Sequence, residues 1–197
     1  MNALAPPPAA FAEEAWLADR LAAPGGVPAL PPDAMQRAAA AFGALPLERA
    51  VVVAEALTDA GRVDAAIALY KGWAGLRPGM ADAAPAWFNL GVLLAGSGDP
   101  AQAAIAYGNA LALRPGLHQA AVNLGLALEA QGRKDEALAT WRRALPDPDM
   151  RRTLHNHLGR MLEEKGRLEE AVAELRASLL LEPDQPDVQQ HLVHLRQ

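Results

Sequence analysis

A repeat of 34 residues constrains the fold of this chain more than any other feature of the sequence. Five columns of residues recur at that spacing in one register, and one of them is Gly91, Gly125 and Gly159. The other four columns start at Leu90, Leu94, Gly98 and Ala103. A period of this length is typical of chains built from repeated units, in which each unit buries its apolar face only against its neighbours. The sequence therefore predicts a stack of similar units.

An earlier, less regular copy of the unit precedes these three at a spacing of 37 residues. The run LRPG at residues 76–79 recurs at 113–116, and Tyr70 aligns with Tyr107. The three additional residues fall near Met80, in a turn between units, where an insertion costs little free energy. The predicted units are residues 47–83, 84–117, 118–151 and 152–185.

Each unit is predicted to contain two helices joined by a turn with glycine. In the unit at 84–117, Trp87, Leu90 and Leu94 have the spacing of one apolar helix face. Asp99 then has the position of an N-cap, and Gln102 completes a capping-box pattern for the second helix. Because these signals recur along the chain, we expect an all-α protein.

Small and bulky residues alternate between the two helices. Gly91 and Ala103 are small because the paired helices must approach closely at these positions. Tyr107 and Trp141 are predicted to fill the space between neighbouring hairpins.

These columns resemble the tetratricopeptide repeat (TPR) family, which shows Trp, Leu-Gly and an aromatic residue or Leu in the first helix. Its second helix carries Ala, an aromatic residue, Ala and Pro. The unit at 84–117 matches almost completely, whereas the unit at 47–83 departs from the pattern and has the bulky Trp73 where Ala is usual. The resemblance implies a right-handed superhelical solenoid of helix-turn-helix hairpins that binds other proteins.

A narrower resemblance concerns residues 154–197. This run is similar to the passage that joins the last repeat to the catalytic region in bacterial SPINDLY-type, O-linked N-acetylglucosamine transferase-like proteins. The resemblance implies an alternative function, in which the chain is the non-catalytic, substrate-recruiting N-terminal arm of a longer glycosyltransferase.

The two ends of the chain depart from the repeat. Residues 1–46 are rich in Pro and Ala, and two helices are expected there, at 11–22 and 33–45, as a diverged capping hairpin. At the other end, residues 186–197 are predicted to form a capping helix with Leu192 on its apolar face, and we expect it to be truncated.

The first helix of each TPR hairpin lines the concave face of the solenoid, which predicts where a partner binds. Four candidate residues stand in or beside one column of that helix: Asn89, Asn123, Asn156 and His157. An Asn amide both donates and accepts, so a ladder of Asn can hold an extended peptide backbone. The alternative is that these amides stabilise local structure.

Four further candidates lie on the same face: Gln119, Glu129, Arg160 and Glu163. A purely solvated role is the alternative for these residues.

Composition and the absence of motifs exclude several classes of function. The chain has no Cys, its net charge is −5, and it shows neither a phosphate-binding loop nor a Ser-His-Asp arrangement. We therefore expect no catalytic centre, no cofactor and no nucleic acid partner. The chain has no apolar run of about 18 residues and no secretory signal. We therefore expect a cytoplasmic location and no membrane partner. The expected partner is a protein or an extended peptide, and a homodimer through an exposed helix face stays open.

Two clusters suggest other chemistry. His191 and His194 could share a metal, but no third ligand is evident, so a surface or packing role is favoured and no metal is expected. Four arginines near one turn could form an anion site, although Asp147 and Asp149 offset their charge: Arg142, Arg143, Arg151 and Arg152.

Overall fold

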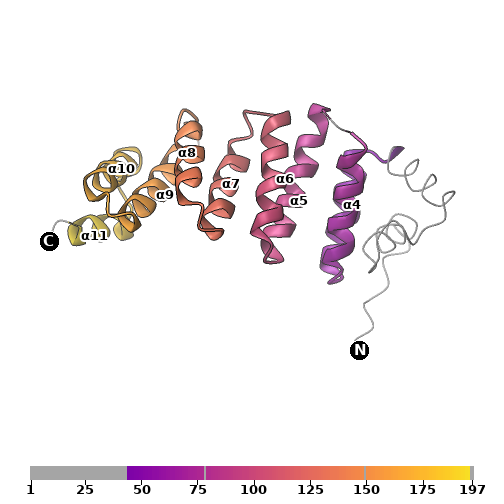
Figure 1. Cartoon of the computed structure of the whole chain (residues 1–197), viewed down its shortest axis with the longest axis horizontal. Helices are drawn as coiled ribbons and strands as arrows, with labels where there is room; N and C mark the ends of the chain where they lie inside the picture. The colour runs from indigo at the N-terminus through magenta and orange to yellow at the C-terminus, as the bar shows by residue number, and fades with distance from the viewer. Residues whose placement is uncertain (1–43, 78, 149, 196–197) are drawn as a thin grey trace. The chain divides into compact units, whose positions relative to one another are not determined.

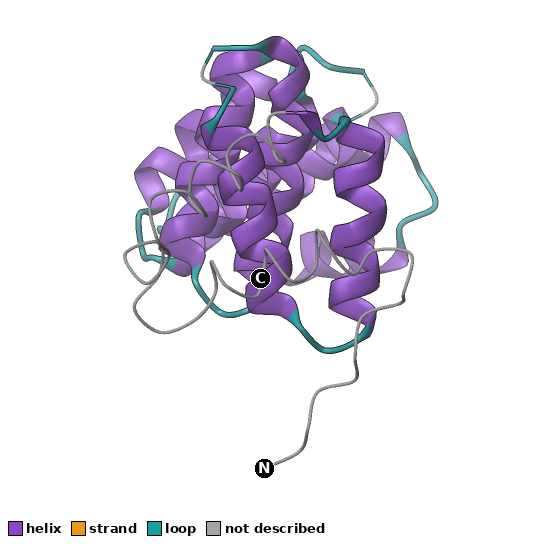
Figure 2. Ribbon diagram, turned by 90° about the vertical axis from the view of Figure 1, so that its right-hand side faces the viewer, coloured by secondary structure: helices purple, strands orange, loops and turns teal. Residues whose placement is uncertain are grey.

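The computed structural model describes residues 44–77, 79–148 and 150–195, and within these ranges all regular structure is helical (Figure 2). The helices predicted within residues 1–46 fall almost entirely outside the described ranges. None of the described helices is long and apolar enough to cross a membrane.

The chain divides into two compact units, and the first ends at Pro115. Its described elements are α3 (Leu47–Asp59), α4 (Val63–Gly75), the 3-10 helix η3 (Ala81–Ala83), α5 (Ala84–Gly96) and α6 (Pro100–Leu113). Helices α3 and α4 form one hairpin. Helices α5 and α6 form the next, and α4 packs against α5 (Figure 1). The insertion predicted near Met80 is η3, which buries Ala83 in the joint between the two hairpins.

The second unit begins at Gly116 and repeats this arrangement. Its helices are α7 (His118–Ala130), α8 (Lys134–Ala144), α9 (Arg151–Glu164), α10 (Leu168–Leu181) and α11 (Pro186–His194). Two hairpins form, α7 with α8 and α9 with α10, and α8 packs against α9 (Figure 1). Helix α11 packs on α10 and buries Leu192.

A glycine with positive φ ends the first helix of every described hairpin. The four glycines are Gly61, Gly98, Gly132 and Gly166, with φ between 72° and 80°. The N–H of the residue after each glycine donates to the carbonyl of a buried leucine five residues back, as Asp99 does to Leu94 at 2.9 Å. This is the Schellman arrangement, and it needs a residue that adopts the left-handed conformation without strain.

The predicted N-cap at Asp99 is confirmed, but only half of the capping box forms. The Asp99 carboxylate accepts a hydrogen bond from the backbone N–H of Gln102 at 3.0 Å. The return bond from the Gln102 side chain cannot form, because the N–H of Asp99 already donates to Leu94.

The glycine of the first helix faces the bulky residue of the second helix of the same hairpin. A Cβ placed on Gly125 would lie 1.9 Å from Nε1 of Trp141, and one on Gly91 would lie 2.5 Å from the Tyr107 ring. The prediction that these aromatic residues fill the space between hairpins was therefore incomplete. Both rings lie against the glycine of their own hairpin, because the missing side chain leaves room there.

Trp73 explains why the first described hairpin departs from the usual Ala. Its indole is 1% exposed and donates from Nε1 to the carbonyl oxygen of Leu45 at 2.7 Å. The Arg77 guanidinium lies over the indole ring, 3.8 Å from its centroid, and donates to the same carbonyl at 3.1 Å. The bulky residue thus fixes the segment that leads into α3.

Replacing Gly125 tests the close contact. In Gly125→Ala the new methyl group overlaps Trp141, whose indole is held by a hydrogen bond to the Val122 carbonyl at 3.1 Å. Overpacking costs about 1–3 kcal/mol, while the helix propensity of Ala returns about 1 kcal/mol, so we expect a net loss of stability. Urea unfolding followed by circular dichroism measures it.

Gly108→Ala is the matched control, because Gly108 lies inside α6 and its Cβ position has no atom within 4 Å apart from its chain neighbours and the nearby backbone of its own helix. This variant should be more stable than the wild type by about 0.5–1 kcal/mol. If Gly125→Ala were stabilised as much as Gly108→Ala, the contact would not limit the helix spacing.

Candidate functional site

The exposed face of α3 is one stripe along the helix. Its exposed residues are Glu48, Val52, Glu55 and Asp59, with the spacing i, i+4, i+7 and i+11. The opposite face of α3 buries Ala50, Val53, Ala54 and Leu57. Helix α5 presents Val92 to solvent at 44% exposure, so this part of the first unit mixes apolar and acidic side chains.

A pocket of about 220 Å³ lies between α3, α4 and α5. We name it the α3–α5 pocket and define it by six of its lining residues: Glu55, Asp59, Tyr70, Asn89, Val92 and Leu93. The predicted contact residue Asn89 is half-buried and donates from Nδ2 to the Tyr70 hydroxyl at 3.2 Å. Burial raises the pKa of Tyr70, the Asn89 hydrogen bond opposes this and the negative charge of Glu55 adds to it. The phenol therefore stays protonated and can donate.

The three asparagines of the predicted ladder have three different environments. Asn89 bonds Tyr70, whereas Asn156 donates to Oε1 of Gln185 at 2.9 Å. Asn123 on α7 is half-buried, and its amide makes no hydrogen bond to the described residues. Gln119, one turn earlier on α7, is exposed. Asn123 and Gln119 are thus the predicted contact residues most open to a partner.

Asn156 belongs to a polar cluster at the N-terminal end of α11. Gln185 is 9% exposed and bonds both the hydroxyl and the carbonyl of the buried Ser178. Oδ1 of Asn156 is buried without a partner in the described residues. A second pocket, of about 550 Å³, adjoins this cluster between α9 and α11, and both positive and negative side chains line it.

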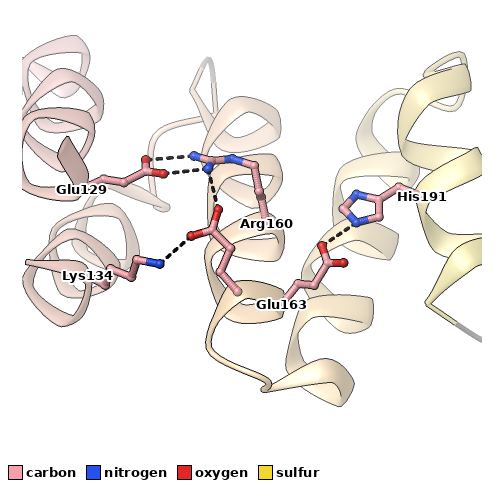
Figure 3. A network of polar contacts seen from close by, with 6 residues as sticks. Glu129, Lys134, Arg160, Glu163 and His191 are labelled. Carbon is pink, nitrogen blue, oxygen red and sulfur yellow. Dashed lines mark hydrogen bonds and ion pairs between the residues drawn. The ribbon is translucent and has the colours of Figure 1, made fainter. Parts of the chain in front are cut away.

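Arg160 and Glu129 bind each other instead of facing solvent separately. Figure 3 shows the Arg160 guanidinium on α9 donating twice to the Glu129 carboxylate on α7, at 2.6 and 2.8 Å. Arg160 also donates to Glu164 at 3.0 Å, and Lys134 bonds the other oxygen of Glu164 at 2.8 Å. The chain's own residues thus neutralise this part of the face.

Glu163 and His191 form a second internal pair, which joins α9 to α11. Nε2 of His191 lies 2.5 Å from the Glu163 carboxylate (Figure 3). No group of three or more His, Cys, Asp or Glu in the described part of the chain is placed to hold a metal. His191 therefore has a structural partner that connects the last helix to the hairpin before it.

His157 is half-buried in the second unit, where it lines the second pocket. Its ring stacks on Trp141 with centroids 5.0 Å apart and an angle of 20° between the planes. Burial lowers the pKa of His157, the positive charge of Arg160 lowers it further and Glu129 opposes the shift. His155, two residues earlier, points elsewhere and lies 2.6 Å from the Glu174 carboxylate.

The predicted arginine cluster is largely engaged. Arg142 pairs with Glu170 at 3.2 Å, and Arg152 pairs with Glu182 at 2.7 Å. Arg151 donates to the backbone carbonyl of Leu145 at 3.3 Å. An anion would have to displace these carboxylates and carbonyls.

Of the six residues that define the α3–α5 pocket, only Asn89 was predicted from the sequence as a contact residue, and the polar side chains that were missed are Glu55, Asp59 and Tyr70. A signal was present, because Glu55 and Asp59 stand one turn apart on the predicted first helix of a unit. They were overlooked because Val53 and Ala54 replace Leu-Gly in this degenerate copy, which obscured the face of its first helix.

A double-mutant cycle measures the Arg160–Glu129 pair. We expect a coupling free energy of about 1 kcal/mol between Glu129→Gln and Arg160→Gln, because the pair is two-pronged but partly exposed. Urea unfolding of the four proteins gives this value, and it should shrink in high salt. A coupling indistinguishable from zero in low salt would show that the pair contributes nothing to stability.

The environment of His157 predicts a pH dependence of stability. Because burial favours its neutral form, the unfolded chain binds more protons below about pH 6.5, and the free energy of unfolding falls as the pH drops through the lowered pKa. His157→Phe keeps an aromatic ring on Trp141 but has no group that titrates there, so it does not lose this part of the stability at low pH. The free energy of unfolding of the variant relative to that of the wild type should therefore increase as the pH is lowered from about 7.5 to about 5.5. An unchanged difference across that interval would contradict the assignment.

The sequence matches a model of the family described as Tetratricopeptide repeat, over residues 54–118, 88–152 and 122–187. None of the curated proteins matches the chain.

Solved structures with the same arrangement of hairpins include three that cover most of this chain. "MamA 41-end from Desulfovibrio magneticus RS-1" is 19% identical with a TM-score of 0.65, and the match covers 77% of this chain and 85% of that one. YrrB, described as "a TPR protein with an unusual peptide-binding site", is 16% identical with a TM-score of 0.62, covering 81% and 84%. PilF of Pseudomonas aeruginosa is 23% identical with a TM-score of 0.59, covering 81% and 68%. The predicted all-α helical-repeat class is thereby confirmed.

Proposed function

The chain belongs to the tetratricopeptide repeat family, and on that premise we propose that it is a protein-interaction scaffold that holds an extended segment of another protein against the first helices of its hairpins. The observation that carries the proposal is the α3–α5 pocket, which combines the Asn89 amide and the Tyr70 hydroxyl with exposed apolar surface at Val92. Concave sites that place a few polar groups on an apolar wall are typical of ligand binding. The peptide-binding site named for YrrB lies on the same fold and supports the proposal.

The partner contacts that we propose are those whose polar groups are still available. The Asn89 amide donates to Tyr70 and keeps its carbonyl oxygen for a peptide N–H, while the Tyr70 hydroxyl can donate to a peptide carbonyl. In the second unit, Gln119 and Asn123 are open in the same way.

The remaining predicted contact residues shape the face and are proposed to bind a partner only indirectly. Arg160 with Glu129, Glu163 with His191 and Asn156 with Gln185 are bonded within the second unit. A partner that competed for these groups would have to break hydrogen bonds already formed, which reduces the net gain in free energy.

The alternative, recruitment of substrates for a linked glycosyltransferase, rests on the sequence of residues 154–197 and stays a prediction. It requires a natural product heavier than the 20.8 kDa of this chain. Immunoblotting of the source cells tests that requirement.

Peptide selection tests the scaffold function. The whole chain is used to select from a phage library of random dodecapeptides, and the affinities of synthetic copies of the selected peptides are then measured. Asn123→Ala should weaken binding about tenfold, a change of about 1.4 kcal/mol, because it removes an open amide.

Asn156→Ala is the control, since it removes an internal hydrogen bond to Gln185 and should lower thermal stability more than affinity. Failure to select any peptide, or equal affinity of Asn123→Ala and wild type for all of them, would count against the proposed groove.

A further inference from the structure

The two units carry their charges differently on the first helices of their hairpins. The exposed residues of α3 and α5 are Glu48, Val52, Glu55, Asp59, Val92, Ala95 and Gly96. This set contains three carboxylates and no cation. On α7 and α9, by contrast, the acidic residues have partners within the unit: Glu129 with Arg160, Glu163 with His191, and Glu164 with Lys134.

Glu55 and Asp59 are the two carboxylates that line the α3–α5 pocket. They stand four residues apart on α3, so both point to the same side of the helix. Neither forms an ion pair or a hydrogen bond through its side chain with any described residue. The negative charge of Glu55 acts on the Tyr70 hydroxyl and helps to raise the pKa of Tyr70.

The rest of the pocket limits what can bind there. Its volume of about 220 Å³ is below the range of about 300–1,000 Å³ typical of pockets for drug-sized ligands, so it suits a single long side chain. Val92 and Leu93 of α5 contribute the apolar part of the lining, and α3 contributes the two carboxylates. The Tyr70 hydroxyl lies at the pocket on a side chain that is only 3% exposed.

We propose that the α3–α5 pocket takes a lysine or arginine side chain of the bound protein segment. The methylene stem packs against Val92 and Leu93, and the positively charged end lies between Glu55 and Asp59. Long cationic side chains bury their stems on apolar surface while their charged ends stay at polar groups, which is the combination that this pocket offers. The inference rests on the proposed scaffold function and adds the chemistry of the partner: a basic residue next to apolar ones.

The test uses peptides selected from random dodecapeptides by the whole wild-type chain. We expect the selected peptides to be enriched in Lys or Arg flanked by apolar residues. The double variant Glu55→Gln with Asp59→Asn should bind them at least about tenfold more weakly, because each neutral amide keeps the shape and loses the charge. Wild-type affinity should also fall as the salt concentration rises.

Asp64→Asn with Asp82→Asn is the control variant. Both residues are exposed acids of the first unit outside the pocket, and their replacement changes the net charge by the same amount. Its affinity should stay within about twofold of the wild type, because unpaired surface charges act weakly at a distance. Circular dichroism of both double variants verifies that they fold.

Each outcome bears on a defined claim. Selected peptides that bind but show no basic enrichment, or that bind the Glu55→Gln, Asp59→Asn variant as tightly as the wild type, would overturn this inference and leave the scaffold function standing. An equal loss of affinity in the control variant would show that the effect comes from the net charge of the protein, and this would also overturn the inference. If the wild type selects no peptides, the scaffold function fails and the inference fails with it.

Discussion

The contact between a glycine on the first helix and a large side chain on the second sets the geometry of each hairpin that has Leu-Gly. Gly91 lies against Tyr107, Gly125 against Trp141, and Gly159 against Leu175. A missing Cβ lets a ring or a leucine lie directly on the helix backbone, and the two axes can then come close enough to exclude water. The rest of the structure depends on this spacing, because it shapes the faces that neighbouring hairpins bury against each other.

The repeat made the fold predictable, because most of the interactions that form each helical hairpin lie within one 34-residue repeat. Apolar spacing identified the helices, the glycine column identified their ends, and Asp99 identified a cap. The prediction was wrong where two local interactions compete for one group, as at the N–H of Asp99. The bonding of Trp73 to Leu45 was likewise not foreseen, since it joins residues 28 positions apart.

The candidate site was less predictable than the fold, because the state of a polar side chain depends on its neighbours in other helices. Arg160 and Glu129 are 31 residues apart, and His191 and Glu163 are 28 apart, so no local pattern announces that they pair. A column of a repeat therefore predicts where a side chain lies and leaves open whether it is available. Asn89, Asn123 and Asn156 illustrate this, since Asn89 bonds Tyr70, Asn156 bonds Gln185, and Asn123 bonds none of the described residues.

The glycine turn inside each hairpin also bears on how the chain reaches its native state. The bonds that close it join residues at most five positions apart, such as Asp99 to Leu94 and Arg133 to Leu128. Contacts of such short sequence separation cost little chain entropy to form, so a single hairpin can assemble before its neighbours are in place. Helical-repeat chains behave as linear arrays in which structure starts at one unit and spreads to adjacent ones. Because this turn recurs in each of the four described hairpins, folding can start at any one of them.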